Sequence, residues 1–494
     1  MRDLARRTSW AVVWKGLEVG GNRAFSLIRT LILAKLLVPD DFGLLAAGIV
    51  TMDVSSQLTN VGIREAVIQQ RAPSREQYDT AWTLDLVRTA LVAVVLILAA
   101  PLIAEYAFGE PRAAKIIRVV AFAPVLDRLA SIEVLTLVRQ LRFRALAAVG
   151  LAGSLVHAVV AIALASTLGV WAMVVGLLAG VIAQTVGTYV VAPCVPRLSF
   201  RLQAARPLLG FGRGVLLRQI VDVVGGAVLQ VVIARRLGTA ELGLYFVAAR
   251  LAFLPREVFR LVGTQVAFPV HAELQLEQAR AARVFRGHLL GSWVVLVPLY
   301  AIVIALAPSL VAQLVGPQWM GAVPAIQVLA AAAVVGVVAN VATPVLLGRG
   351  LTTAVALIFA LRSLAIVAVV WSLAAHLGLA GACFAWVVAE ALGAGLSWFA
   401  VRRFLPDAFD AVARPGIATI GAAGVGAAVA AGLDRLVPAI PGLFLGALLA
   451  LTAALATLWW LDRRLRLGLA GEIGRILPSW ARWSTTRPRE SLTP

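Results

Sequence analysis

Residues 33–44 read LAKLLVPDDFGL, and residues 233–244 read IARRLGTAELGL. At this offset of 200 residues, Asp41 is matched by Glu241. Four further residues recur unchanged, namely Ala34, Leu37, Gly43 and Leu44. A second internal match aligns residues 100–109, APLIAEYAFG, with residues 307–316, APSLVAQLVG. Because the two matches occur in the same order in both parts of the chain, the sequence predicts an internal repeat.

The repeat lies in a chain whose composition excludes an ordinary soluble protein. The 494 residues are 61% hydrophobic and 14% charged, and the mean hydropathy is +0.91. A soluble domain is about half apolar and about a quarter charged, so this chain has too little polar surface to cover a globule. We therefore predict an all-α protein that crosses a membrane many times.

Apolar stretches long enough to cross a bilayer, which takes roughly 20 residues, follow one another along the chain. We expect about fourteen transmembrane helices, connected by short turns such as VPDD at 38–41 and STLG at 166–169. Their ranges are 10–37, 42–66, 80–107, 114–138, 144–167, 169–192, 207–237, 242–269, 284–308, 321–347, 352–376, 378–401, 412–436 and 441–461.

The spacing of the repeat predicts the domain organisation. Six predicted helices separate the two copies, so corresponding helices run in the same direction and the repeat is parallel. We expect two six-helix lobes, residues 1–206 and 207–403, that face each other around a central cavity able to open to either side. Residues 404–461 add two helices outside the repeat, and residues 462–494 are expected to form a disordered basic tail.

The net charge of +19 reflects topology rather than a nucleic-acid partner. Arginines are concentrated in alternate loops, and positively charged loops stay on the cytoplasmic side of a membrane. This places both termini in the cytoplasm, in a protein of the inner membrane. The basic start, MRDLARRTSW, lacks the apolar core of a signal peptide, so we expect it to begin the first helix. Cys194 and Cys383 lack metal-ligand spacing and are expected to be free thiols.

The amino-acid sequence around the first copy of the repeat also resembles a known family. The stretches LAKLLVPDDFGLLAAG at 33–48, NVGIREAVIQQ at 60–70, YDTAW at 78–82 and VRQLRFRAL at 138–146 are similar to the polysaccharide-biosynthesis flippases, whose superfamily also includes the MATE multidrug exporters. This resemblance covers the first twelve predicted helices. It implies a V-shaped pair of six-helix bundles that work by alternating access.

The resemblance also implies a cargo, a polyprenyl-diphosphate-linked oligosaccharide that is exported for exopolysaccharide, capsule or O-antigen synthesis. Membrane lipid, a polysaccharide polymerase and the export machinery are the partners it suggests. No enzymatic chemistry, metal or cofactor belongs to this family. Whether Na⁺ or H⁺ is coupled to the transport cycle stays open on the sequence.

Ionisable residues inside the predicted helices are candidate cargo contacts, because such groups are costly in a bilayer and usually face an interior or a water-filled cavity. In the first helix, four polar residues fall at spacings of three, four and seven, which places them on one helical face. These residues are Lys15, Glu18, Asn22 and Arg29. A diphosphate needs several cationic donors, and arginine can bind phosphate oxygens through two N–H groups at once.

We therefore predict a cationic cavity formed by Arg23, Arg29, Arg218, Arg250 and Arg260. Further candidates, for contacts to sugar hydroxyls or to a coupling ion, are Lys15, Glu18, Asn22, Asp53, Asp85, Asp222 and Glu257. His157 stands alone in an apolar stretch and is interpreted as a packed residue. Arg362 and Glu390 either pair with each other or serve ion coupling.

Three other functions stay open on the sequence alone. A MATE-type drug antiporter carries an organic cation, which the intramembrane arginines disfavour. A membrane polysaccharide polymerase or glycosyltransferase needs a sizeable catalytic loop or a carboxylate cluster, whereas the predicted outer loops are short and nearly uncharged. A non-transporting scaffold of a polysaccharide-synthesis complex would retain the fold and tolerate loss of the arginines.

Overall fold

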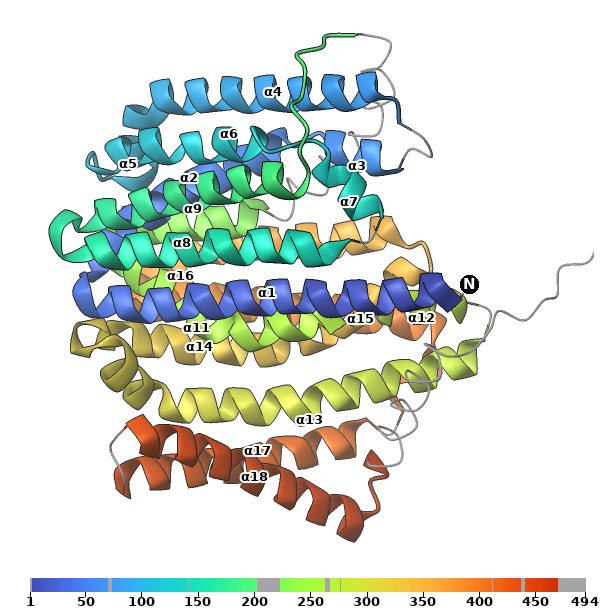
Figure 1. The fold of residues 1–494 in the computed structure, drawn as a ribbon. Helices are drawn as coiled ribbons and strands as arrows, with labels where there is room; N and C mark the ends of the chain where they lie inside the picture. Colours follow the sequence, from blue (N-terminus) through green and yellow to red (C-terminus); the bar gives the residue numbers. More distant parts are fainter. Residues whose placement is uncertain are drawn as a thin grey trace, which may run out of the picture.

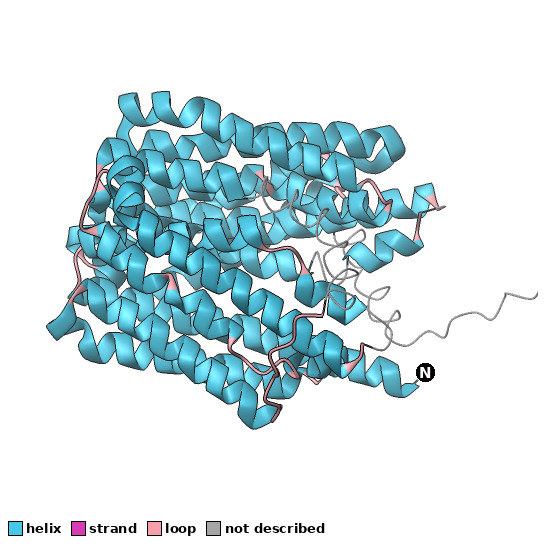
Figure 2. Ribbon diagram, turned by 90° about the horizontal axis from the view of Figure 1, so that it is seen from above, coloured by secondary structure: helices cyan, strands magenta, loops and turns pink. Residues whose placement is uncertain are grey.

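A computed structural model of the protein describes residues 2–69, 73–140, 142–201, 223–262, 267–275, 277–410, 412–436 and 440–469. These residues form helices and short loops, with no strand among them (Figure 2). The long helices lie roughly parallel to one another in both views (Figures 1 and 2). The N-terminal helices α4 to α9 occupy the upper part of Figure 1, α13, α17 and α18 occupy the lower part, and α1 and α11 lie between them.

The N-terminal half follows the predicted order of helices. Its helices are α1 (Arg2–Leu36), α2 (Pro39–Thr59), α3 (Ile63–Gln69), α4 (Arg75–Leu102), the π-helical η1 (Ile103–Phe108), α5 (Ala113–Val120), α6 (Phe122–Arg128), α7 (Val134–Arg139), α8 (Phe143–Leu168) and α9 (Val170–Val191). The predicted lobe boundary at 206/207 lies outside the described residues.

The C-terminal half begins, within the described residues, with a helix at 223–237. The remaining helices are α11 (Thr239–Val262), α12 (Phe268–Glu273), α13 (Gln278–Leu310), η3 (Val311–Val315), η4 (Pro317–Ala322), α14 (Val323–Val335), α15 (Val337–Gly348), α16 (Thr352–Phe404), η5 (Pro406–Phe409), α17 (Ala413–Leu436) and α18 (Ile440–Leu465). Residues 470–494, most of the predicted tail, lie outside the described part.

Nine helices within the described residues are long and apolar enough to cross a membrane. The chain is therefore an all-α, multi-pass membrane protein. Each of the fourteen predicted ranges overlaps helix in the described residues, but the total of fourteen crossings stays a prediction.

Three predicted helices are wrong as continuous spans. The range 321–347 begins in η4 and is divided at Gly336 into α14 and α15. The range 114–138 is divided into α5, α6 and α7. At this break, the Ser131 amide donates to Thr188 Oγ1 at 3.0 Å and the Ser131 hydroxyl donates to the Ala192 oxygen at 2.7 Å. Such side-chain partners make non-helical backbone tolerable inside a membrane protein. The range 42–66 is also too long, because α2 ends at Thr59 and the chain turns at Gly62 with a φ of 64°.

Two equivalent glycines make the sharpest turns. Gly169 joins α8 to α9 with φ 55° and ψ −129°, and Gly378 bends α16 with φ 59° and ψ −141°. Residues with a side chain rarely adopt this region, so glycine is required at both places. The predicted boundary between 352–376 and 378–401 is thereby confirmed at Gly378. The matching dihedral angles are a further sign of the internal repeat.

The two copies of the repeat meet at one end of the bundle, at the left of Figure 1. There α2 packs along α11, and the two helices touch through their glycines. A Cβ added at Gly43 would overlap the backbone oxygen of Thr239, and one at Gly243 would overlap that of Pro39. This reciprocal contact follows the offset of 200 residues, so two equivalent surfaces pack against each other. We call this region, with the turns at 37–38, 109–112, 238 and 316, the sealed end.

Polar contacts reinforce the sealed end. Asp40 forms an ion pair with Arg112 of the same half at 3.0 Å, and it accepts a hydrogen bond from the Thr239 hydroxyl of the other half. Further bonds between the halves are Arg235 Nη1 to the Glu105 oxygen at 2.9 Å and Trp319 Nε1 to the Ala34 oxygen at 2.7 Å. Hydrogen bonds from Arg112 also hold the pKa of Glu110, in the exposed turn, below its usual range.

Apolar packing completes the seal. Phe42 contacts Trp319 edge to face, with ring centroids 4.9 Å apart, and it also lies 6.3 Å from the ring of Phe246. Phe42 and Trp319 are almost fully buried in a core that draws residues from both halves. The halves are therefore joined at this end by apolar burial, by backbone contact and by hydrogen bonds at once.

Candidate functional site

A central cavity of about 120 Å³ lies between the two halves, next to the sealed end and toward the middle of the bundle. Its lining comes from α1, α2, α8, α9 and α11, and consists of Arg29, Thr30, Leu33, Phe42, Leu45, Ile49, His157, Met173, Leu177, Phe246 and Arg250. With a helical rise of about 1.5 Å per residue, Arg29 and Arg250 lie about 12–17 Å from the sealed end. This depth is near the middle of a hydrocarbon core that is about 30 Å thick.

Arg29 and Arg250, two of the five predicted arginines, meet in this cavity. Both approach the hydroxyl of Ser26, Arg250 Nη1 at 2.5 Å and Arg29 Nη2 at 3.5 Å. Arg250 also donates to Thr30 Oγ1 at 3.5 Å, and its guanidinium lies 4.5 Å from the centre of the Phe246 ring. One serine on α1 therefore holds cations from both halves of the chain.

The cavity has a surplus of positive charge. Arg29 forms no ion pair with any described residue, and Arg250 has Asp53 as a more distant electrostatic neighbour. Two guanidinium groups repel each other strongly where water is scarce. A bound anion would remove that repulsion and satisfy several N–H donors at once. The arrangement is thus suited to an anionic group such as a phosphate.

Arg23 and Glu257 form the next layer away from the sealed end. Arg23 Nη2 lies 3.6 Å from Glu257 Oε2, a second contact between α1 and α11, and the Arg23 side chain is 53% exposed. Glu257 has a further partner besides Arg23. The sequence grouped both residues with the cargo contacts; the structure pairs them with each other across the two halves.

The other predicted residues of α1 lie against α8. Lys15 pairs with Glu18 at 3.0 Å, and the carboxylate of Glu18 faces the backbone at Gly150. Asn22 Oδ1 accepts a hydrogen bond from the Ser154 hydroxyl at 2.8 Å. The predicted polar face of α1 therefore follows the α1–α8 seam, and only its far end, at Arg29, reaches the cavity.

Asp85 lies away from the central cavity, inside the N-terminal half. It is 6% exposed and is surrounded by three arginines. Its ion-pair distances are 2.6 Å to Arg88, 3.2 Å to Arg128 and 3.6 Å to Arg64. The structure therefore makes Asp85 the counter-ion of a separate arginine cluster, and does not bring it together with Arg29 and Arg250.

The remaining predicted residues cannot be placed in the same way. Arg218 and Asp222 lie outside the described residues. Arg260 lies in α11, but its side chain is outside the described part. Within the described residues, no group of three or more His, Cys, Asp or Glu side chains is arranged to hold a metal ion.

The pairing of Arg362 with Glu390, one of two possibilities on the sequence, is confirmed. Glu390 is fully buried in the C-terminal half, and it accepts a second ion pair, from Arg256 at 3.0 Å. Its other oxygen, Oε2, is buried without a hydrogen-bond partner and lies against Gly336. The pairing of Arg256 with Glu390 was not predicted, because 134 positions separate the two residues.

Two cavity residues were not predicted as cargo contacts, Thr30 and His157. His157 was interpreted as a packed residue, yet it lines the cavity beside the two arginines. Thr30 lies one helical turn after Ser26, whose backbone oxygen accepts its hydroxyl at 2.7 Å. A signal for Thr30 was available in the i, i+4 spacing from Ser26. His157 became a lining residue only through the packing of α8 on α1.

Known proteins are similar to this chain in sequence and in fold. A family model described as "Polysaccharide biosynthesis protein" matches residues 32–324. The succinoglycan biosynthesis transport protein ExoT of Rhizobium meliloti (strain 1021) is 26% identical over 327 residues, which span 66% of either chain, just under two thirds. The lipopolysaccharide biosynthesis protein WzxC of Escherichia coli (strain K12) is 24% identical over 353 residues, 69% of this chain and 70% of that protein.

Solved structures show the same fold at low sequence identity. The lipid II flippase MurJ, in an inward closed conformation, is similar with a TM-score of 0.74 and 13% identity, over 92% of this chain and 99% of MurJ. An inward-facing MATE family transporter of the MOP superfamily is similar with a TM-score of 0.61, over 78% of this chain and 95% of that one. Because the family model covers more than half of its length, the chain belongs to the polysaccharide biosynthesis protein family, within the fold shared by MurJ and the MATE transporters.

Proposed function

We propose that this protein is a flippase that moves a polyprenyl-diphosphate-linked oligosaccharide from the cytoplasmic to the outer leaflet of the inner membrane. The observation that carries this proposal is the pair Arg29 and Arg250, which share Ser26 in a cavity near mid-membrane depth. A diphosphate presents several oxygens to such donors. The proposal is supported by two relatives, one named for transport in succinoglycan biosynthesis and the other for lipopolysaccharide biosynthesis.

The direction of transport follows from the charge distribution and the seal. Arginine-rich loops are concentrated at the end opposite the sealed end, so the positive-inside rule makes the sealed end the outer one. The cavity would then load from the cytoplasmic leaflet and release its cargo when the contacts between Gly43 and Thr239 separate. Alternating access of this kind requires the cargo to bind the two conformations with different affinity. The protein moves its cargo across the membrane and makes or breaks no covalent bond.

A drug antiporter fits the cavity poorly. An organic cation would enter a space in which Arg29 carries no counter-ion among the described residues, and like charges in a low-dielectric site repel. The MATE resemblance is a resemblance of fold, at 13% identity. The polymerase alternative lacks support because the lining of the arginine-bearing cavity, within the described residues, offers no carboxylate pair for glycosyl transfer.

The experiment that tests the proposal is to delete the gene in the host and to measure where the polyprenyl-diphosphate-linked oligosaccharide accumulates. We expect accumulation on the cytoplasmic leaflet, rescued by the wild type but not by the expressed double variant Arg29→Gln, Arg250→Gln. Arg118→Gln is the matched control, because Arg118 is an exposed arginine on α5 that donates only to the Ile97 oxygen. Full rescue by the double variant would refute the role of these arginines, and no accumulation after deletion would refute the flippase.

A further inference from the structure

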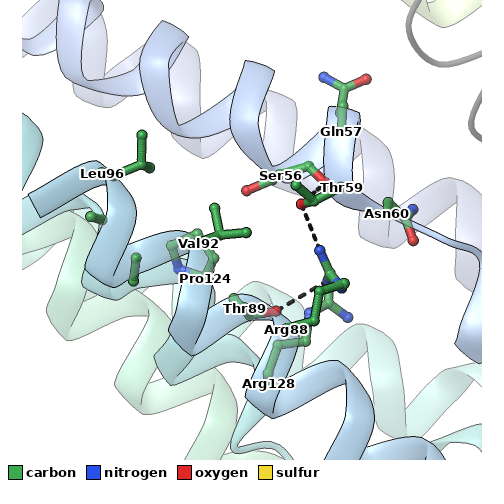
Figure 3. A pocket seen from close by; sticks show the side chains of 12 residues that line it. Ser56, Gln57, Thr59, Asn60, Arg88, Thr89, Val92, Leu96, Pro124 and Arg128 are labelled. Carbon is green, nitrogen blue, oxygen red and sulfur yellow. Dashed lines mark hydrogen bonds between the residues drawn. The ribbon is translucent and has the colours of Figure 1, made fainter. Parts of the chain in front are cut away.

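A second cavity, of about 160 Å³, lies within the N-terminal half between α2, α4 and α6. One end of it is polar and is formed by Ser56, Gln57, Thr59, Asn60, Arg88, Thr89 and Arg128. The other end is apolar and is formed by Val92, Ala93, Leu96, Ala121 and Pro124. Figure 3 shows Arg88 of α4 hydrogen-bonded to Thr59 of α2 and to Thr89, with Val92 and Leu96 further along α4.

Arg88 and Arg128 form the cationic part of the polar end. Both pair with Asp85, and Arg128 Nε lies 3.6 Å from Asp127 Oδ2. That distance is too long for a hydrogen bond, so Arg128 Nε is buried without a hydrogen-bond partner. A buried donor of this kind is costly unless an acceptor reaches it, and an anion in the cavity would supply that acceptor.

The depth of the polar end in the membrane follows from its distance to the sealed end along α2 and α4. Arg88 precedes Phe108, at the sealed end, by 20 residues, and Thr59 follows Pro39, also at the sealed end, by 20 residues. Both intervals correspond to about 30 Å of helix, which is about the thickness of the hydrocarbon core. Arg88 and Thr59 are therefore expected at the membrane–water interface of the leaflet opposite the sealed end, where lipid phosphates lie.

The apolar end of the cavity extends toward the bilayer centre, which is the direction that the chain of a bound lipid takes. Leu96 follows Arg88 by eight residues, about 12 Å along α4 toward the sealed end and thus into the hydrocarbon. On the same stretch of α4, Leu91, Val95 and Leu98 are 64%, 55% and 74% exposed, so this helix borders lipid. The cavity thus has a cationic end at headgroup depth and an apolar end that runs toward the bilayer centre.

We propose that this cavity binds the phosphate of a membrane lipid, with the phosphate between Arg88 and Arg128 and the start of the lipid chain along Val92 and Leu96. The site is separate from Arg29 and Arg250, and the proposal stands whether or not the central cavity carries an oligosaccharide. Two lipids present the same chemistry here: an anionic phospholipid, which would be a bound structural lipid, and a polyprenyl diphosphate, for which the site would be a docking position in the cytoplasmic leaflet.

The test is to measure lipid retention by native mass spectrometry of the full chain, purified from zwitterionic nanodiscs to which one probe has been added. The three probes are phosphatidylglycerol, polyprenyl diphosphate and inorganic diphosphate. Ser56→Leu fills the cavity and leaves every ion pair of Asp85 in place, whereas Arg88→Gln removes one cation. We expect each variant to weaken retention of at least one of the two lipid probes about tenfold or more.

Two controls make the result specific. Arg201→Gln also removes a cytoplasmic-side arginine with an ion-pair partner, Glu76, but Arg201 does not line the cavity, so lipid retention should be unchanged. The Arg29→Gln, Arg250→Gln variant should retain the lipid as well, which separates this site from the central one. Preference for either lipid supports the proposal. Equal retention by Ser56→Leu and the wild type, or binding of inorganic diphosphate alone, would overturn it.

Discussion

A methyl group added at the sealed end should open it. Gly43 and Gly243 allow α2 and α11 to touch through their backbones, and a Cβ at either one would overlap a backbone oxygen of the opposite helix. At Gly243 the added Cβ would also lie 2.8 Å from the Pro39 carbonyl carbon and 2.9 Å from the Gly43 nitrogen. Carbon atoms pack at about 3.5–4.0 Å, so the helices must separate by roughly 1 Å.

The free energy that this separation costs has a lower and an upper bound. Overpacking a core by one methyl costs about 1–3 kcal/mol, and the atoms in the way are backbone, which cannot rotate aside as a side chain can. The upper part of that range applies. A change of about 2–3 kcal/mol in the balance between two conformations corresponds to about a 30- to 150-fold shift in population. Gly43→Ala and Gly243→Ala should each shift the protein away from the sealed conformation by that factor.

The assay is labelling of a buried reporter by a maleimide that does not cross membranes. In a background with Cys194 and Cys383 replaced, Leu242→Cys places the reporter at a fully buried position beside the seal. We expect the labelling rate to rise tenfold or more in the Gly43→Ala variant. Val38→Cys, at a position 53% exposed, shows the rate of an accessible thiol at the same end.

The matched control is Gly424→Ala, a helical glycine at which an added Cβ meets no atom within 4 Å. It should leave labelling unchanged and stabilise its helix slightly, since alanine is the better helix former. If Gly43→Ala folds with an unchanged melting temperature and its reporter labels no faster than in Gly424→Ala, the close contact does not hold the seal and the reasoning is refuted.

Three further predictions concern stability and are checked by thermal unfolding in detergent. Glu390→Gln leaves two buried guanidinium groups without a counter-charge and should cost about 3–5 kcal/mol; a loss below 1 kcal/mol would contradict the buried ion triad. Gly378→Ala forces a side chain into positive φ and should cost about 1–3 kcal/mol, whereas Gly395→Ala, at an unconstrained position of the same helix, should not. Trp319→Phe removes the bond to the Ala34 oxygen, which Gln318 still reaches at 2.9 Å, and leaves a cavity at a fully buried position, so a loss of about 1–3 kcal/mol is expected.

Some features of the site could be predicted because they are local in sequence or repeated in it. The offset of 200 residues identified Gly43 and Gly243 as equivalent, and the structure places them in reciprocal contact. The cost of a charge in a bilayer was enough to select Arg29 and Arg250 as cavity residues. The turn before 378 was predicted from the end of an apolar stretch, and Gly378 makes it.

Other features could not be predicted because they depend on which helix faces which. Asp85 looked like Asp53 on the sequence, since each is a carboxylate inside an apolar helix. Packing of α3, α4 and α6 surrounds Asp85 with three arginines, whereas Asp53 is left exposed within electrostatic range of Arg250. The spacing of three residues marks Arg88 as a helical partner of Asp85, but Arg64 and Arg128 lie 21 and 43 positions away and have no such spacing.

The sequence by itself thus determined that the chain is a helical membrane protein with an internal repeat and with cations inside its helices, because the solvation cost of a residue depends on its own chemistry. Only the tertiary structure decided that Ser26 joins Arg29 to Arg250, that Arg23 pairs with Glu257, and that the polar face of α1 runs along α8. The physical reason is that an ion pair or hydrogen bond depends on the distance between two groups, and that distance is set by helix packing rather than by position along the chain.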